Sequence, residues 1–340
     1  MTSLPLIRTA CLVFVFVFAF ASSASGASPA SASPSFELVA LGVEGGIRTD
    51  NLSAYLLKAI GDDRYLGLDA GTLVSGIQVA LAHGALPDAH GSDLAAAGSV
   101  LRNGIAGYFI SHAHLDHIAG LVIASPDDRG SKPLYGLAST TQRLSADYFN
   151  WDAWPNLANT GKAPAIGRYT LTAEPPGRWF EVAGTSMQAA IYPLWHDSAV
   201  SSMILLRHGD AYYAYFGDTG PDALSKGQHR LADIWQVLAP LVRAHRLKGL
   251  QIEVSSPGDV PDAQLFGHMT PAWLHRELAA LATQAGDPLA LHGLPVIIDH
   301  IKPSLEPGRD PRALIARELS EGDTTGVRYV VIGQGDRVKL

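Results

Sequence analysis

The segment FISHAHLDHIAGLVIASP, residues 109–126, places three histidines and an aspartate within six positions, directly after an apolar run. These residues are His112, His114, Asp116 and His117. Imidazole nitrogens and carboxylate oxygens are ligands of zinc and of related divalent cations. A lone histidine is usually an ordinary surface or core residue, but four such side chains this close together indicate a metal site. The first two can bind one cation and the last two a neighbouring one.

Three further candidate ligands stand at the ends of apolar segments that are typical of strands. His196 follows IYPLW, Asp218 follows YYAYFG and His300 follows VIID. Strand ends hold their side chains rigidly, as a metal site on an α/β scaffold requires. We therefore expect these three residues to join the cluster at 112–117.

The rest of the chain alternates between short apolar segments with glycine turns and longer helical segments. Strands are predicted at 36–43, 65–72, 105–114, 187–196, 210–218, 249–256 and 294–300. Helices are predicted at 76–86, 231–247 and 271–284. The last of these begins at Pro271, and proline is favoured in the first helical turn. Strands mixed with helices of this length predict an α/β protein.

The N-terminus has the pattern of a secretory signal. Arg8 precedes ACLVFVFVFAFA, an apolar run of 12 residues, and the small-residue stretch SSASGASPASASP follows it. A run this short suits a signal peptide better than a membrane-spanning helix, which needs about 20 residues. We predict a signal peptide at 1–26, a flexible spacer at 27–34 and a single domain at 35–340. The mature protein would be periplasmic or secreted, without stable membrane insertion; an uncleaved membrane anchor is the alternative.

Composition narrows the classes of partner and ligand. The chain has 340 residues, 47% hydrophobic and 17% charged, which suits a globular protein with a large core. Its 25 basic and 32 acidic residues include no Lys/Arg cluster, so we expect no nucleic-acid partner. The single cysteine, Cys11, lies in the predicted signal peptide. A mature chain would therefore bind metals through histidine and carboxylate ligands.

The order of these residues resembles a known family. The pattern from His112 to His117 resembles the H-x-H-x-D-H signature of the metallo-β-lactamase superfamily. The longer stretch 112–126 resembles the signature of the class II cyclic-nucleotide phosphodiesterases. Further pieces match in the same order, at 51–57, 68–72, 154–157, 216–220, 252–257, 265–271 and 299–304. The resemblance implies a metallo-β-lactamase-like four-layer αββα sandwich, with 35–340 as its single catalytic domain.

The family pattern also implies a site for two zinc ions, or for other divalent metals in their place. One metal would bind His112, His114 and His196, the other Asp116, His117 and His300, and Asp218 would bridge the two. A carboxylate that holds two cations a few ångströms apart suits phosphoester hydrolysis.

The reaction implied is hydrolysis of 3′,5′-cyclic nucleotides to nucleoside 5′-monophosphates by a metal-bound hydroxide. The substrate would be cAMP, with cGMP as a second candidate. The catalytic candidates are Asp116 and His268; the latter, in GHMTP, would protonate the leaving 3′ oxygen or bind the phosphate. A structural role at the entry of the following helix is the alternative for His268. Asp69 and Glu253 would accept hydrogen bonds from ligand histidines.

The sequence says less about how the base of the cyclic nucleotide is recognised than about the metal site. The segment 148–157 contains Tyr148, Phe149, Trp151 and Trp154, whose faces can stack on a purine. These rings can equally form the core of an inserted helical segment. The pattern favours neither adenine nor guanine. The expected partner is a small cyclic nucleotide, and a homodimer is compatible with the sequence.

The sequence supports two rival functions less well. Another hydrolase of the superfamily, such as a lactonase, thioesterase or β-lactamase, would share the H-x-H-x-D-H pattern but not the longer motifs. A binding protein without activity would be expected to lack metal ligands, whereas all seven are present.

Overall fold

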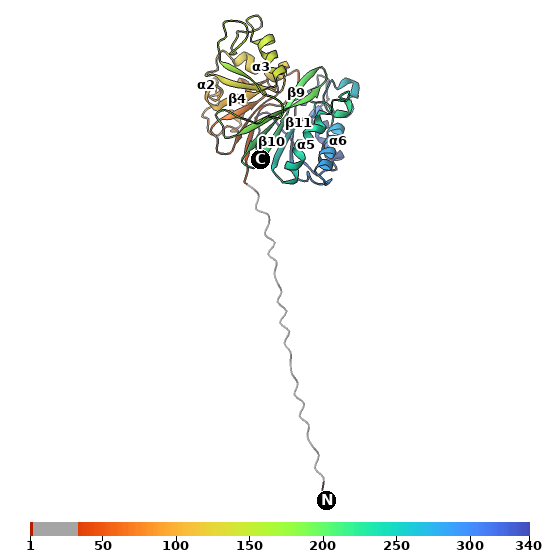
Figure 1. The fold of residues 1–340 in the computed structure, drawn as a ribbon. Coiled ribbons are helices and arrows are strands. Elements are labelled where there is room, and N and C mark those ends of the chain that lie inside the picture. The colour runs from red at the N-terminus through yellow and green to blue at the C-terminus, as the bar shows by residue number, and fades with distance from the viewer. Residues whose placement is uncertain (3–32) are drawn as a thin grey trace. The chain divides into compact units, whose positions relative to one another are not determined.

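The computed structural model describes residues 1–2 and 33–340 and separates Met1–Ser33 from one compact unit, Pro34–Leu340. All elements described below belong to this second unit (Figure 1). Apart from residues 1–2 and 33–34, the predicted signal peptide and spacer lie outside the described residues. Among the helices of the described part, none combines the length and the apolar character needed to cross a membrane.

The strands form two seven-stranded sheets. The first has the order β14 (Arg337–Lys339), β1 (Phe36–Gly42), β2 (Ala54–Ala59), β3 (Tyr65–Leu68), β4 (Ile105–Phe109), β5 (Lys132–Gly136) and β6 (Tyr169–Ala173). The second has the order β13 (Arg328–Val331), β12 (Pro295–Asp299), β11 (Leu247–Glu253), β10 (Ala211–Phe216), β9 (Ala199–His208), β8 (Gln188–His196) and β7 (Phe180–Glu181).

Helices connect and cover these strands. They are α1 (Val74–Ala82), α2 (Leu94–Ser99), α3 (Leu115–Ala124), α4 (Ala138–Arg143), α5 (Arg230–Arg243), α6 (Pro271–Gln284) and α7 (Pro311–Gly322). Short helical turns are η1 (Val100–Gly104), η2 (Leu144–Tyr148), η3 (Asp222–Leu224) and η4 (Asp262–Gln264). Of these, η1 and η2 are π-helical and continue α2 and α4.

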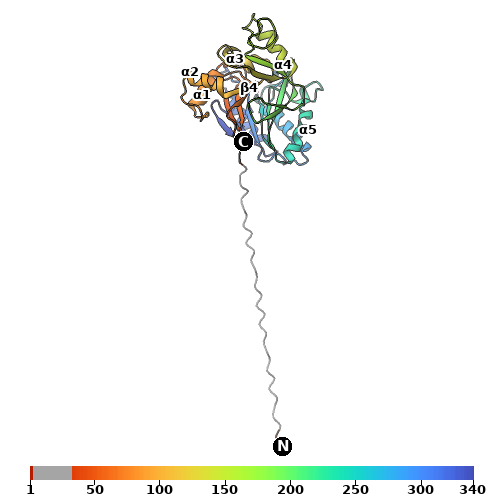
Figure 2. The same ribbon diagram turned by 60° about the vertical axis from the view of Figure 1, so that its left-hand side comes forward.

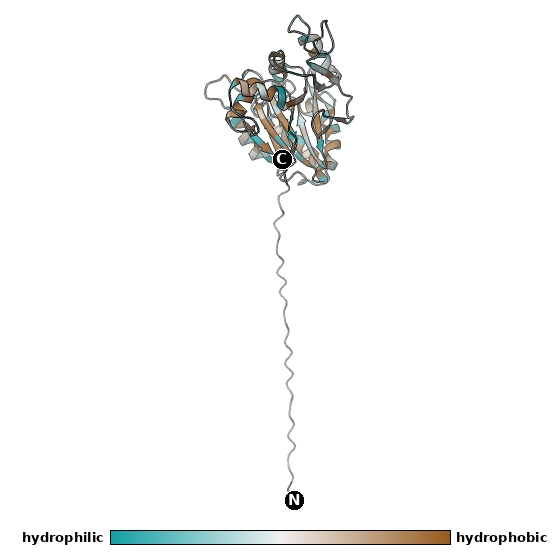
Figure 3. Cartoon of the chain, turned by 90° about the vertical axis from the view of Figure 1, so that its left-hand side faces the viewer, coloured by the Kyte–Doolittle hydropathy of each residue, from teal (hydrophilic) through white to brown (hydrophobic). Residues whose placement is uncertain are grey.

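The two sheets pack face to face between two layers of helices (Figure 2). Successive residues of β1 point to opposite faces, so Leu38 packs between the sheets and Val39 packs toward α1 and α3. Phe36 and Tyr213 join the sheets, with 6.1 Å between their ring centroids. A third core lies between the second sheet and α5, α6 and α7. Apolar residues are concentrated on the strands (Figure 3), and the predicted αββα sandwich is confirmed.

Strand direction brings distant segments to one edge of the second sheet. Both β8 and β10 are antiparallel to β9 and therefore parallel to each other, and β11 and β12 continue parallel to β10. Their carboxyl ends share one edge, which is where open α/β sheets bind ligands. In the first sheet, β3 and β4 are likewise parallel.

Most predicted elements are present, with shifted limits. Strands β1, β4, β8, β10, β11 and β12 and helices α5 and α6 lie where the sequence indicates. Strand β3 ends at Leu68, before the predicted residue 72, because Asp69 turns the chain with a φ of 54°. Strand β4 ends at Phe109, before residue 114, and α1 begins and ends earlier than 76–86. The sequence analysis missed seven strands: β2, β5 and β9, which lie inside their sheets, and β6, β7, β13 and β14.

Candidate metal centre

The first four candidate ligands lie at the junction of β4 and α3. His112 and His114 are in the connecting loop, and Asp116 and His117 are in the first turn of the helix. His112 and His117 are buried, Asp116 is half-buried and His114 is exposed. Nε2 of His112 lies 3.0 Å from Nδ1 of His114. The cluster is therefore open to solvent on the side of His114.

The other three candidates come from the carboxyl edge of the second sheet. His196 ends β8, Asp218 follows β10 and His300 follows β12. Nε2 of His196 lies 3.3 Å from Nδ1 of His114. Nε2 of His300 lies 3.3 Å from Oδ2 of Asp116. Residues of both sheets thus meet in one cluster.

Asp218 lies at the centre of this cluster and is 3% exposed. Its Oδ1 is 3.2 Å from Nε2 of His117, and its Oδ2 is 3.3 Å from Nε2 of His300. Oδ2 is also 3.8 Å from Nε2 of His112 and 3.7 Å from Nε2 of His196. The structure brings all seven candidate ligands together, with this carboxylate between the two groups.

Hydrogen bonds on the outer side of the rings fix which nitrogen faces the centre. Nδ1 of His196 donates to the carbonyl of Gly267 at 3.0 Å, and Nδ1 of His117 donates to Oδ2 of Asp69 at 2.8 Å. Both partners can only accept, so in the neutral ring the proton is on Nδ1 and the inward Nε2 carries a lone pair. Serine hydroxyls contact the other two buried rings: Ser111 Oγ is 3.0 Å from Nδ1 of His112, and Ser255 Oγ is 2.9 Å from Nδ1 of His300.

The ligand atoms that face the centre suit binding to a divalent cation better than direct contact with one another. Nε2 of His117 is buried and has no hydrogen-bond partner among residues 33–340, although it lies 3.2 Å from an oxygen of Asp218. Two lone pairs this close repel unless a positive charge lies between them. Histidine nitrogens and carboxylate oxygens without cysteine are a donor set that zinc accepts.

The pKa values of the buried groups also indicate a site for a cation. Burial lowers the pKa of His196 to about 4, so this ring is the neutral imidazole that binds metals. Burial alone would raise the pKa of Asp218, but His300 and His117 hold it well below its usual value. Burial would also lower the pKa of His117, yet Asp218 and two further carboxylates raise it well above its usual value. The carboxylates therefore favour a positive charge here, whether a proton or a metal ion.

Two glycines that the sequence analysis did not identify allow a loop to close on the site. A Cβ on Gly45 would lie 2.2 Å from the ring of His300. The backbone N–H of Gly46 donates to Oδ2 of Asp116 at 3.1 Å. No side chain fits at Gly45, and Gly46 has a φ of 91°, which glycine adopts readily. The Gly-Gly pair soon after β1 was the available signal.

His268 lies inside the cluster. It is 5% exposed, and its Nδ1 is 2.6 Å from Oε1 of Glu253 and 3.1 Å from Oγ of Ser255. Glu253 therefore accepts from a histidine of the site, as Asp69 does. Nδ1 is also 3.8 Å from Asp218, and His196, Asp218 and His268 offer atoms within 4.8 Å of one another. His268 thus lies beside residues of the metal centre, and its role is not limited to the start of the following helix.

Comparison with known proteins follows this geometry. The family model of the class-II cAMP phosphodiesterases matches residues 89–335, which is most of the chain. The chain belongs to this family. A probable 3′,5′-cyclic-nucleotide phosphodiesterase of Yersinia pestis is 44% identical over 312 residues, 91% of this chain and 90% of that protein. A 3′,5′-cyclic-nucleotide phosphodiesterase of Aliivibrio fischeri is 43% identical over 312 residues, 91% of this chain and 94% of that protein. The predicted family and enzyme class are confirmed.

Solved structures support the fold of this class-II phosphodiesterase family member. Unliganded yeast PDE1 aligns with a TM-score of 0.80 at 22% identity, over 90% of this chain and 100% of that one. The metallo-β-lactamase fold protein YhfI from Bacillus subtilis aligns with a TM-score of 0.56 at 16% identity, over 90% and 100%. At these identities the likeness concerns the fold alone. The fold family, together with the His/Asp clusters, implies a divalent metal.

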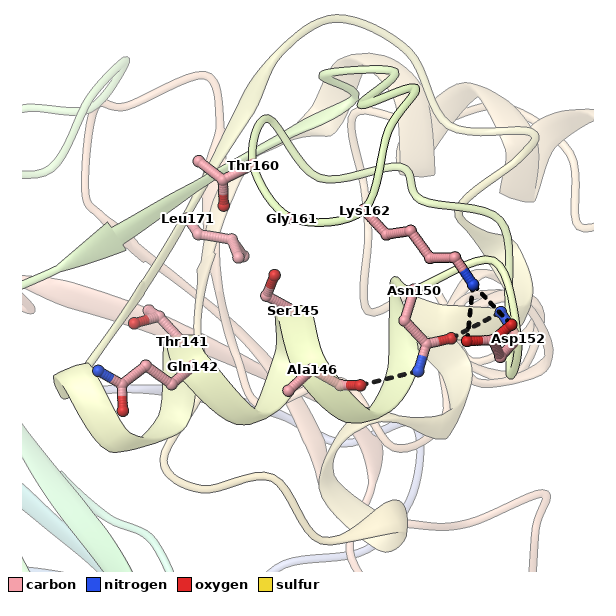
Figure 4. A pocket seen from close by; sticks show the side chains of 10 residues that line it. All are labelled: Thr141, Gln142, Ser145, Ala146, Asn150, Asp152, Thr160, Gly161, Lys162 and Leu171. Atoms are coloured by element: carbon pink, nitrogen blue, oxygen red, sulfur yellow. Dashed lines mark hydrogen bonds and ion pairs between the residues drawn. The ribbon is translucent and has the colours of Figure 1, made fainter.

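Two cavities flank the helical segment 138–148 of this phosphodiesterase. The first, of about 460 Å³, has His112 and His114 in its wall and therefore opens onto the metal centre. The second, of about 660 Å³, is drawn in Figure 4, and of the described residues that line it none is a candidate ligand. Its Lys162 is already paired with both carboxylate oxygens of Asp152, at 2.8 and 2.9 Å. The smaller cavity is therefore the one that can hold a substrate bound at the metal centre.

Of the four aromatic residues proposed for base recognition, one lines the smaller cavity. That residue is Tyr148. Phe149 is fully buried in the core. The indole N–H of Trp154 donates to Oγ of Ser125 at 3.1 Å, and that of Trp151 donates to a backbone carbonyl at 2.9 Å. These three rings therefore stabilise the inserted segment.

Proposed function

We propose that the protein hydrolyses 3′,5′-cyclic nucleotides, cAMP and as a second candidate cGMP, to nucleoside 5′-monophosphates with two zinc ions as cofactors. The observation that carries the proposal is the convergence of seven candidate ligands on Asp218, beside an open cavity, in a member of the class-II family. The names of the relatives from Yersinia pestis and Aliivibrio fischeri support the cyclic-nucleotide substrate.

The proposed ligands form two groups that share Asp218. One group is His112, His114 and His196, and the other is Asp116, His117 and His300. Divalent cations held there would supply stabilisation of charge on the phosphoryl oxygens and activation of the attacking water. Other members of the superfamily share such a centre, so a lactonase, thioesterase or β-lactamase stays the alternative that the assay below must exclude.

The protein's own residues orient the site and move a proton. Asp69 and the carbonyl of Gly267 accept from Nδ1 of His117 and His196 and so orient Nε2 of each ring toward the centre. The 3′ alkoxide is a poor leaving group and needs a proton as it departs. His268, backed by Glu253 at 2.6 Å, is the proposed donor of that proton.

The test is chromatography of the product formed from cAMP. We expect 5′-AMP, loss of activity after treatment with a chelator, and recovery on addition of zinc, because the inward lone pairs need a cation. Elemental analysis should find about two zinc ions per chain, since seven ligands suit two metals. Formation of 3′-AMP, or hydrolysis of a lactone, thioester or β-lactam without hydrolysis of cAMP, would contradict the proposal.

Export is a further part of the proposal. Residues 1–26 have the signal-peptide pattern, so the enzyme would act on extracellular or periplasmic cyclic nucleotide. Fractionation of the native host should recover a shortened chain outside the cytoplasm, and a variant lacking residues 2–26 should stay inside. A full-length chain in the cytoplasm would refute export. A homodimer also stays a prediction.

A further inference from the structure

The cavity beside His112 and His114 has the size and position of a substrate pocket. Its volume of about 460 Å³ lies within the roughly 300–1,000 Å³ of small-molecule sites. The helical segment 139–148 supplies one part of its lining, and residues 198–200, at the end of the turn after β8 and the start of β9, supply another. A phosphate held at the metal centre can therefore extend its nucleoside into this cavity.

The helical segment presents different side chains to its two cavities. Ser139, Arg143 and Asp147 follow one another at four-residue spacing, which places them on one helical face. All three line the cavity at the metal centre. Thr141 and Ser145, on another face, line the cavity of Figure 4. The arginine and the aspartate therefore face the side on which the chemistry takes place.

Apolar and fixed surfaces complete the cavity. Val200 is 50% exposed and lines it. Tyr148 lines it as well, and its hydroxyl donates to the carbonyl of Ala113 at 2.9 Å. This bond ties the tyrosine to the loop that carries His112 and His114. A flat base can lie against such a surface while its polar edge reaches the charged helical face.

The ion pair of Arg143 and Asp147 is too exposed to add much to the stability of the fold. Nη1 of Arg143 lies 3.1 Å from Oδ2 of Asp147, and the two side chains are 71% and 44% exposed. An exposed pair at this spacing contributes little to stability, because solvent screens the two charges. The guanidinium has five N–H donors, so one bond to Asp147 leaves others for a ligand. The ion pair thus holds Arg143 at the cavity, and the remaining N–H groups of its guanidinium can bind a ligand.

Purine edges differ in what they offer an arginine. Guanine presents two acceptors, N7 and O6, which arginine binds in bidentate fashion, whereas adenine presents N7 beside an amino group that only donates. We propose that this cavity receives the nucleoside of the substrate and that Arg143 is a specificity-determining residue, donating to N7 and O6 of guanine. Asp147 positions its guanidinium. This inference rests on the proposed function and concerns the substrate's base.

The experiment compares kcat and KM for cGMP, cAMP and bis(4-nitrophenyl) phosphate, which has no purine. Arg143→Met should lower kcat/KM for cGMP by about 10-fold, mainly through KM, because a base contact made alike in ground and transition states is uniform binding. The loss for cAMP should stay below about 3-fold, and the nitrophenyl ester should be unaffected, since neither offers the bidentate edge. Asp147→Asn should change the rates in the same direction but less.

A matched control uses the exposed pair of Arg317 and Glu321, which has the same spacing in α7. Arg317→Met should leave all three substrates unchanged. Equal losses of Arg143→Met on cGMP and cAMP, or no loss on either, would overturn the inference while the proposed function stands. A wild-type enzyme that cleaves the nitrophenyl ester but no cyclic nucleotide, or none of the three, would overturn the proposed function and the inference with it.

Discussion

Asp218→Ala should lower kcat/KM for cAMP by about 10³-fold or more. Two cations supply several kcal/mol of charge stabilisation, and a loss of about 4 kcal/mol corresponds to this factor. Asp218 is the residue that both proposed ligand groups share, and its oxygens lie 3.2 Å from His117 and 3.3 Å from His300. Its removal leaves these buried rings without the charge between them. Elemental analysis should therefore show less than two zinc ions per chain.

Two kinds of variant make this prediction specific. Asp218→Asn keeps the shape of the side chain but removes its charge, so it should lose metal and activity nearly as severely as Asp218→Ala. His83→Ala and His229→Ala alter exposed histidines and should retain full activity and metal. Near-normal rates with two bound metals in the Asn variant would contradict a bridging role for Asp218.

The sequence could predict the metal cluster because its first part is local. A loop followed by one helical turn keeps His112, His114, Asp116 and His117 close together. The positions of His196, Asp218 and His300 after apolar strands indicated that they join this cluster. Their meeting depends on strand direction, however. Strand β8 runs parallel to β10 because β9 lies between them, and β9 was not predicted.

The rest of the site depends on packing between distant segments. Gly46 bonds Asp116 across 70 positions, which no local pattern indicates. Strand β2 was not predicted; its segment AYLLKA carries a lysine, yet Lys58 is only 8% exposed. Its Nζ lies 3.7 Å from Glu37 on the neighbouring strand, a pairing that exists only once β1 and β2 are side by side. The cavity at Tyr148 is likewise a product of the tertiary fold.

His268→Ala should lower kcat for cAMP by a factor on the order of 10²–10⁴, the usual range for a general acid. Nδ1 of His268 is held by Glu253 at 2.6 Å, so Nε2 is the nitrogen left for the substrate. This Nε2 has no hydrogen-bond partner within the described part of the chain and, unlike Nε2 of His117, is not sealed from solvent. A proton on it can reach the departing 3′ oxygen. Zinc content should stay unchanged.

A graded set of variants separates this role from the others. His268→Asn places an amide N–H where Nδ1 was, so it can still donate to Glu253 but offers no proton at the position of Nε2. It should fold, keep its zinc and lose kcat as the alanine variant does. Glu253→Gln keeps the ring but removes the carboxylate behind it, and should cost about 10–100-fold, as for partners of this kind.

The leaving group decides whether His268 gives a proton. A nitrophenyl phosphodiester releases an acidic alcohol that departs without help, so both histidine variants should lose far less on it than on cAMP. Equal losses on the two substrates, with zinc retained, would instead assign His268 to phosphate binding. Loss of one zinc would assign it as a ligand with His196 and Asp218, whose offered atoms lie within 4.8 Å of its own. Lower stability with normal turnover of the folded fraction would leave it a purely structural residue, held by Glu253 and Ser255.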